Sequence, residues 1–436
     1  MNTFKPFQIG LIGFFAVLAI VAIVALTTYQ STKKDATQVY GDRIVVWGTL
    51  SQEAFTAVFK DISATDRAFS VVEYRQFDET AFDFELVNAI AEGRSPDLIV
   101  LSSNAMTTHR SKLLPISYDN LTERYIKDTF IDGVGVFMFD EGTYGLPFAV
   151  DPLVMYWNRD ALASAGIAQA PRTWEELLSS VVAKLTVRDT SKNIHKSGLA
   201  FGEFRNVAHA KEVLLLLSLQ TGSKMISAVA NSYNVTLNEA QGDSTINPPL
   251  EAAVQFFTLF SNVDNQLYSW NRAMMRDSEA FLSGDLALYF GFGSEYQSLQ
   301  QKNPNLNFDV ASVPQGEQAT ALRTYGEFYS FAIPKASTHV QEAFAVANVL
   351  TTKDSVNALT HSLRMAPVRS DLIAEGDENP YRSVILQSAL IARGWLDPGV
   401  AKSNNIFMRL IEGVVSNSMG INDAVGDAIG RLILAY

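Results

Sequence analysis

Apolar and polar residues alternate in blocks between residues 43 and 102. The strand-like runs are 43–47, 69–74 and 97–102. Between them, apolar residues recur three or four positions apart, as on one face of a helix. These helical positions are Phe55, Val58, Phe59 and Ile62, then Phe82, Leu86 and Ile90. Strands that alternate with helices predict a parallel α/β sheet, whose ligands bind beyond the carboxyl ends of the strands.

The stretch from Tyr144 to Leu178 carries the clearest local signals. It predicts a strand over Leu153–Trp157 and a short helix over Asp160–Ala165 that ends at Gly166. Thr173 and Glu176 have the spacing of a capping box at the start of the next helix. Further along, runs at 286–290, 308–313 and 328–333 predict strands, and helical patterns fill 338–434.

The N-terminus contains an unbroken apolar run from Ile9 to Leu26. This run is longer than the usual core of a cleaved signal peptide, and the residues after it form a poor cleavage site. We therefore expect a short tail at 1–8, an uncleaved transmembrane signal anchor at 9–28 and a polar stalk at 29–42. A cleaved signal peptide is the alternative. The rest of the chain is expected on the extracytoplasmic side of the cell membrane.

Composition excludes several classes of protein. The chain has 46 acidic and 34 basic residues and a formal net charge of −12, which argues against a nucleic-acid partner. It has no cysteine, so disulfides, thiol catalysis and cysteine-ligated metals are excluded. None of the common catalytic motifs is present, and the five histidines lack the spacing of metal ligands. We expect no metal, no cofactor and no enzymatic activity, and assign the histidines to surface or capping positions.

Several short motifs follow one another in the order seen in a known family. They are Gly93-Arg-Ser-Pro-Asp97, Tyr144 to Leu178, Phe281 to Gly291, Ala311-Ser-Val-Pro314, Ser330 to Lys335 and Arg364 to Arg369. Together they resemble the bacterial family-1 extracellular solute-binding proteins, the maltose-binding type. The resemblance implies a two-lobe periplasmic-binding-protein-like fold (type II) with discontinuous lobes joined by a hinge. Lobe one would comprise 43–150 plus 312–336, and lobe two 155–308 plus 338–436.

The resemblance also implies a function and a site. A monomeric receptor would capture a small solute, with a sugar or oligosaccharide favoured, by hinge closure and deliver it to the permease of an ABC importer. The polar candidates for ligand binding are Asn104, Asp151, Glu203, Thr49 and Ser51. The aromatic candidates are Trp47, Phe204, Phe292, Tyr325 and Phe328. For each aromatic residue the alternative is core packing, and for Asp151 and Glu203 it is a hinge cap or a surface ion pair.

Two other classes of function stay open at this point. An extracellular glycosidase would need two carboxylates at a defined separation, which the sequence alone does not reveal. A ligand-sensing ectodomain without transport would need a signalling partner, because only about eight residues precede the apolar run.

Overall fold

The computed structural model describes residues 40, 43–229, 232–239 and 248–436. The three predicted strands at the start of this part are present. They are β1 (Ile44–Gly48), β2 (Val72–Gln76) and β3 (Leu98–Ser102), and β1 pairs in parallel with both of the others. The intervening helices are α2 (Gln52–Thr65) and α3 (Glu79–Ala91). The α/β class that the alternation predicted is confirmed.

A long buried strand, β6 (Leu146–Asn158), runs through the middle of the molecule. Its first part pairs with β13 (Thr324–Ala332) and its last part with β11 (Leu286–Phe292), both antiparallel. The predicted strand at Leu153–Trp157 is thus the end of a longer one. The sheet is mixed rather than all parallel, because β13 is antiparallel to β3 as well as to β6.

The main sheet has eleven strands, in the order β2-β1-β3-β13-β6-β11-β8-β7, with β12 and β14 paired to β6 and β15 paired to β13. The remaining strands in this sheet are β7 (Val187–Arg188), β8 (Ile194–Leu199), β12 (Phe308–Ala311), β14 (Ala366–Pro367) and β15 (Ala392–Arg393). Two hairpins lie outside it, β4 (Met138–Phe139) with β5 (Gly142–Thr143), and β9 (Met225–Val229) with β10 (Ser232–Thr236).

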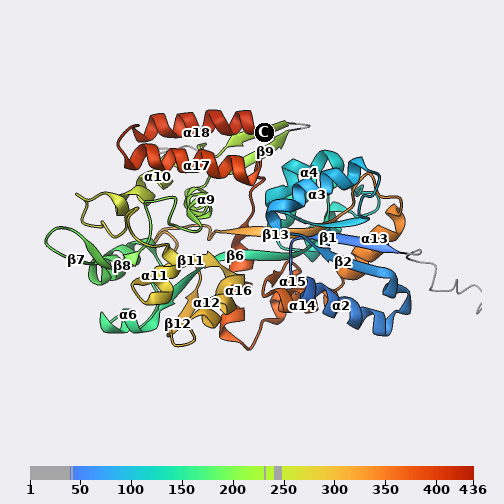
Figure 1. The fold of residues 1–436 in the computed structure, drawn as a ribbon, viewed down its shortest axis with the longest axis horizontal. Helices are drawn as coiled ribbons and strands as arrows, with labels where there is room; N and C mark the ends of the chain where they lie inside the picture. The colour runs from blue at the N-terminus through green and yellow to red at the C-terminus, as the bar shows by residue number, and fades with distance from the viewer. Residues whose placement is uncertain (1–39, 41–42, 230–231, 240–247) are drawn as a thin grey trace, which may run out of the picture.

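Helices cover the sheet on both sides (Figure 1). The helices that lie between β3 and β12 in the sequence are α4 (Met106–His109), α5 (Glu123–Thr129), α6 (Arg159–Ser164), α7 (Trp174–Glu176), α8 (Ala183–Leu185), α9 (Ala210–Gln220), α10 (Pro249–Thr258), α11 (Asp277–Ser283) and α12 (Tyr296–Lys302). The helices that follow β13 in the sequence are α13 (Val340–Leu350), α14 (Lys353–Leu363), α15 (Ser370–Glu375), α16 (Pro380–Ile391), α17 (Val400–Val415) and α18 (Ile421–Ala435).

The helix caps follow the local signals. Thr173 Oγ1 accepts a hydrogen bond from the backbone N–H of Glu176 at 3.1 Å, as a capping box requires. The Glu176 carboxylate, however, accepts from the N–H of Arg172 at 2.9 Å rather than from that of Thr173. Ser51 caps α2 by accepting from the N–H of Ala54 at 3.3 Å.

Figure 1 shows an elongated molecule with two halves. We call the half that contains β1–β3, α2, α3, α13 and α14 the β1 half, and the half that contains α9, α10, α17 and α18 the α9 half. β6 and β13 connect them. The expected assignment of 338–436 to one lobe differs from the packing. α13 and α14 pack against each other and against β6, and α14 also packs against α2, whereas α17 and α18 pack against α10. The chain therefore returns from the β1 half through α16, whose Tyr381 ring stacks on that of Tyr296, with centroids 4.1 Å apart.

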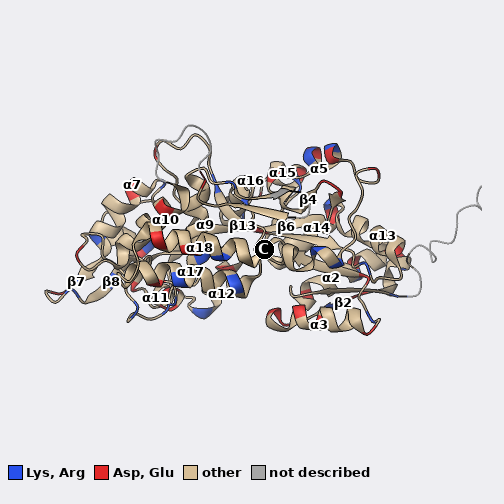
Figure 2. Ribbon diagram, turned by 90° about the horizontal axis from the view of Figure 1, so that it is seen from above, with Lys and Arg blue, Asp and Glu red and all other residues tan. Residues whose placement is uncertain are grey.

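Residues 9–28, which we expect to span a membrane, lie outside the described residues, as do the tail at 1–8 and most of the stalk. Within the described ranges, no helix has the length and apolar character needed to cross a bilayer. Figure 2 shows that Lys, Arg, Asp and Glu are spread over the outer helices and loops, while β6 and β13 between them carry few. The charged residues that β6 and β13 do carry therefore stand out.

Candidate functional site

One face of four neighbouring strands gathers polar and aromatic side chains where the halves meet. Residues directly opposite each other in paired strands share a face, and alternate residues along a strand do too. Tyr329 of β13 lies opposite Ser102 of β3, and Glu327 lies opposite Asp151 of β6. Phe292 of β11 lies opposite Leu153, which is two residues from Asp151 and so on its face. The central sheet face, as we call it, comprises Ser102, Asp151, Phe292, Tyr325, Glu327 and Tyr329.

Asp151 and Glu327 form a like-charged pair on this face. The Asp151 side chain is only 4% exposed, and its Oδ1 accepts a hydrogen bond from the backbone N–H of Ser294 at 3.0 Å. Burial raises the pKa of Asp151 to about 7. Burial likewise raises the pKa of Glu327 to about 7, and the nearby carboxylates of Glu79, Asp151 and Glu212 add to the effect. Both pKa values are raised because removing water and adding like charges disfavour the ionised form.

An amide and two rings lie beside the pair. The Tyr325 hydroxyl donates a hydrogen bond to Asn104 Oδ1 at 2.9 Å, and both side chains are buried. The ring of Phe292 lies 6.3 Å from that of Tyr325, centroid to centroid, and stays half-buried, like Tyr329. The structure therefore brings together four of the predicted site residues: Asn104, Asp151, Phe292 and Tyr325.

His209, at the start of α9, is also part of this region. Its Nε2 lies 2.8 Å from Glu295 Oε1, outside ideal hydrogen-bond alignment, so we describe the contact as an ion pair. Burial alone would lower the pKa of His209, but Glu295, Glu212 and Asp277 outweigh it and raise the pKa to about 9. Its ring packs edge-on against Phe292, with centroids 5.0 Å apart. The assignment of every histidine to an ordinary surface or capping position is wrong for His209, and also for His109, which is fully buried with its Nε2 2.7 Å from Asp83 Oδ1.

A second cation on α9 is fully paired. Lys211 Nζ lies 2.9 Å from Asp397 Oδ2 and 3.3 Å from Ser403 Oγ, and all three side chains are buried. The Ser403 hydroxyl also donates to Asp397 at 2.7 Å. Burial would lower the pKa of Lys211, but Glu212 and Asp397 outweigh it and raise that pKa. This group is a satisfied ion pair in the α9 half.

Glu203 and Phe204 lie on the loop before α9. Glu203 is buried, and its carboxylate lies 3.5 Å from Arg272 Nε. Burial raises the pKa of Glu203, and Glu412 of α17 acts in the same direction. Phe204 is half-buried. The contacts of Glu203 thus connect it to Arg272 and α17, and not to Asn104 or Asp151.

Four further candidates have other roles in the structure. Phe328 is fully buried on the opposite face of β13, where its ring packs against Gly133, so it cannot line the central sheet face. Strand alternation is the physical reason. Trp47 packs its ring against Phe77, with centroids 4.4 Å apart. The Ser51 hydroxyl caps α2 as described above, and the Thr49 carbonyl accepts from Gln76 Nε2 at 3.3 Å.

Glu327 is a residue that the sequence analysis missed. The predicted strand begins at residue 328, one position after Glu327, so Glu327 is not among the candidates. A carboxylate inside an otherwise apolar and aromatic strand, Thr324–Ala332, is the signal that would have found it.

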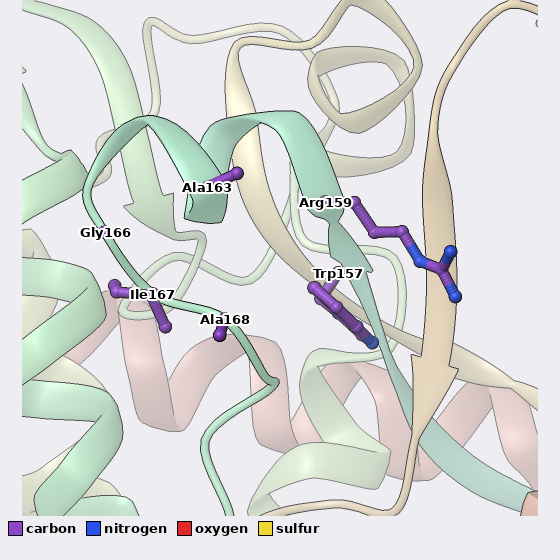
Figure 3. A pocket seen from close by; sticks show the side chains of 6 residues that line it. All are labelled: Trp157, Arg159, Ala163, Gly166, Ile167 and Ala168. Atoms are coloured by element: carbon purple, nitrogen blue, oxygen red, sulfur yellow. The ribbon is translucent and has the colours of Figure 1, made fainter.

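Two cavities lie away from the central sheet face. One of about 620 Å³ is lined by Trp157, Arg159, Ala163, Gly166, Ile167 and Ala168 (Figure 3). In it, the Arg159 guanidinium lies 5.6 Å from the centre of the Trp157 ring and also pairs with Asp309. The other, of about 300 Å³, lies along α17 and α18. Neither is lined by a residue of the central sheet face. In the part of the chain that the structure describes, no group of three or more His, Asp or Glu is placed to hold a metal ion.

Comparison with known proteins identifies the family. A family model described as bacterial extracellular solute-binding protein matches residues 54–381. The chain belongs to the bacterial extracellular solute-binding proteins. Binding proteins from Brucella abortus (strain 2308) and Brucella suis biovar 1 (strain 1330) are each 24% identical to this solute-binding protein over 290 residues, or 66% of this chain. That match spans 66% of the length of each relative, just under two thirds.

Solved structures share the fold of this solute-binding protein. A cyclo/maltodextrin-binding protein in complex with maltotetraose has a TM-score of 0.71 at 16% identity, covering 90% of this chain and 96% of the other. The cyclic α-maltosyl-1,6-maltose binding protein of Arthrobacter globiformis has a TM-score of 0.72 at 15% identity, covering 90% and 98%. The maltotriose binding protein of Thermus thermophilus has a TM-score of 0.64 at 16% identity, covering 90% and 100%. An α/β fold shared with sugar-binding proteins is thereby confirmed, while the division into discontinuous lobes joined by a hinge stays a prediction.

Proposed function

We propose that this protein is an extracytoplasmic receptor that captures a sugar or oligosaccharide between its two halves and delivers it to an ABC importer. The observation that carries the proposal is the central sheet face. It lies on the strands that connect the halves, and it combines half-exposed rings with a buried carboxylate, a half-buried carboxylate and an amide. Sugars suit such a surface because their C–H faces pack on aromatic rings while carboxylates and amides bind the hydroxyls.

The mechanism would be closure of the halves around the solute. The two lobes would be the β1 half and the α9 half, and β6 and β13 would bend between them. A ligand shifts such an equilibrium only as far as it binds the closed form better than the open form. Asp151 accepts from Ser294, which follows β11, and Asn104, which follows β3, accepts from Tyr325, so a solute bound on this face would contact residues from both ends of the sheet.

The family match and the structures with maltooligosaccharides support a sugar as the solute. Residues 9–28 would tether the receptor to the membrane, with a permease as partner and the receptor itself a monomer. Mass spectrometry of the mature protein tests the tether. An N-terminus between residues 27 and 38 would mean that the apolar run is cleaved instead.

A thermal-shift screen of the full chain tests the binding function. The screen would contain maltotriose, maltotetraose, other sugars, amino acids and polyamines. A ligand at about 100 times its dissociation constant stabilises the folded state by roughly 2.7 kcal/mol, so a true solute should raise the melting temperature by several degrees. A shift with a sugar that disappears in Asp151→Ala supports the proposal. A screen in which only non-sugars stabilise the protein would contradict it.

Two further measurements examine the mechanism. Small-angle scattering should show that the molecule becomes more compact when it is saturated with ligand, and unchanged dimensions would contradict hinge closure. Product analysis after long incubation with the bound sugar should recover it intact. Hydrolysis would instead favour the alternative, a glycosidase.

A further inference from the structure

Two carboxylates face each other on the central sheet face with no cation between them. Glu327 and Asp151 are directly opposite in the antiparallel pairing of β13 and β6. Side chains at such positions have Cβ atoms roughly 4.5–5.5 Å apart, and like charges there repel each other. Strand pairs rarely keep such an arrangement without a compensating partner. We propose that a positively charged amino group of the solute is this partner, so that the receptor selects an amine-bearing sugar or polyol over a neutral one. This inference rests on the proposed function, because it places the solute on the same face.

The charges around the pair support this assignment. The acidic groups whose charge acts on Glu327 are Glu79 at the start of α3, Asp151 on β6 and Glu212 on α9, while its hydrogen-bond donor, the Ser102 hydroxyl, is neutral. Lys211 on α9 is the cation within range. Asp151 also faces Glu295. Acidic groups from both halves thus surround the pair.

The nearby cations are engaged elsewhere. The charge of Lys211 acts on Glu327 only from a distance. The Lys211 ammonium group itself is bound by Asp397 at 2.9 Å and by Ser403. His209 lies within range of Asp151 but pairs with Glu295 at 2.8 Å. Neither cation can therefore leave its own carboxylate for the Asp151–Glu327 pair without exposing another buried charge.

A second observation points to a ligand at the same place. Asn104 is only 8% exposed, and its carbonyl oxygen accepts the Tyr325 hydroxyl, but no hydrogen bond from its amide nitrogen is found among the described residues. This nitrogen is not among the fully buried polar atoms that lack a partner, so it is accessible from outside the side chain's own contacts. Since Tyr325 belongs to the central sheet face, the free N–H groups of Asn104 lie beside that face and can donate to a solute hydroxyl. The half-exposed rings of Phe292 and Tyr329 supply the apolar walls, and aromatic faces also attract cations.

The protonation state of the free protein agrees with this assignment. Burial and mutual repulsion raise the pKa of both carboxyls to about 7, so the empty face holds protons near neutral pH that a bound cation would displace. A hydroxyl group can also hydrogen-bond to these oxygens, but it leaves the charge uncompensated. An ammonium group compensates the charge and makes charge-assisted hydrogen bonds, which are about twice as strong as neutral ones.

Calorimetric titration with matched sugars tests the inference. The pairs are glucosamine against glucose, and the β-linked disaccharide of glucosamine against its N,N′-diacetylated form, which keeps the skeleton and loses the charge. We expect the amine to bind at least about ten-fold more tightly than its neutral counterpart in one pair. Glu327→Gln should remove this preference. Glu378→Gln, which changes an exposed acid on the loop before α16, should keep it.

Three outcomes would overturn the inference. If the neutral member of each pair binds as tightly as the amine or more so, or if Glu327→Gln keeps the preference, the charge pair does not select the solute. If only neutral sugars of the thermal-shift screen bind, the inference fails while the proposed function stands. If no sugar of either kind binds, both fail together.

Discussion

Two groups of buried charges lie within the same region of this molecule, and they are built in opposite ways. Lys211, Asp397 and Ser403 form a closed group in which every charged atom has a partner. Asp151 and Glu327 form an open group of two like charges whose hydrogen-bond donors are neutral: Ser294 donates to Asp151, and the Ser102 hydroxyl donates to Glu327. The first arrangement contributes to folding and has nothing left to offer a ligand. The second is unfavourable in the empty protein and becomes favourable only when something compensates it, as expected of a binding site.

The largest expected effect concerns the closed group. Lys211→Met leaves Asp397 buried without its cation, which should reduce the free energy of unfolding by about 3–5 kcal/mol. Urea denaturation measures the loss. The double variant Lys211→Met with Asp397→Leu should recover much of it, because the uncompensated charge is gone. If the single variant is as stable as the parent, the pair is not buried as described.

The open group should behave in the opposite way. Glu327→Gln should stabilise the ligand-free protein at pH values above about 7, by about 2–3 kcal/mol, because it removes a charge that folding desolvates. The sign follows from the raised pKa of Glu327. The folded state holds the proton up to about pH 7 and the unfolded state releases it near its ordinary value, so this contribution to stability is complete at low pH and lost as the pH rises through 7.

The difference between Glu327→Gln and the parent should therefore grow from pH 5 to pH 8 and vanish near pH 4. Melting temperatures across this range, with Glu378→Gln as the exposed control, give the profile. A flat difference, or a Glu327→Gln variant that is less stable than the parent at pH 8, would show that the Glu327 charge is already compensated.

His209 offers a check at higher pH. Its pKa of about 9 lies above the ordinary value near 6.5, so its ion pair with Glu295 stabilises fully below pH 6.5 and is lost as the pH rises through 9. His209→Gln should cost about 1–2 kcal/mol at pH 6 and little at pH 10, since the neutral ring contributes no charge there. Urea denaturation at both values measures this. Equal losses of stability at pH 6 and at pH 10 would mean that the His209 ring contributes through packing alone.

The smallest effect concerns the hydrogen bond beside the open group. Tyr325→Phe removes the donor to Asn104 Oδ1 and should cost about 1 kcal/mol in stability. The freed amide can then turn, so affinity for the solute should fall as well. Phe328→Leu, on the other face of the same strand, should lower stability without a specific loss of affinity. If the Tyr325→Phe variant binds the solute as tightly as the parent, Asn104 is not part of the binding site.

Local sequence patterns predicted the local parts of this structure. The strands β1–β3, the helix after Arg159 and the Thr173 cap depend on neighbouring residues, and the patterns located them. The pairing of β13 with β3, β6 and β15 joins residues far apart in the chain and has no local signal. That pairing extends β13 to Thr324, which places Glu327 in the strand. The positions of α13 and α14 depend on the same long-range packing.

The residues of the candidate site likewise include some that local patterns identify and others that only long-range packing brings together. Asn104 and Asp151 are candidates because of the rule that sites lie at strand ends and at the crossing between halves, and the structure brings them into the same region. Phe328 lies on the opposite face of β13 from the other candidates, because the phase of a strand decides which face a residue occupies. His209 and Glu327 were missed because their importance comes from charges that only the fold brings near them.

The central claim is that the solute binds on the central sheet face. A crystal structure of the full chain with the best ligand of the thermal-shift and calorimetric panels tests it most directly. The account predicts ligand density between the halves, with a polar group of the solute within hydrogen-bond distance of the Asp151 and Glu327 carboxylates and its ring against Phe292 or Tyr329. Density in the cavity beside Trp157 and Arg159, with Asp151 and Glu327 free of contacts, would contradict it.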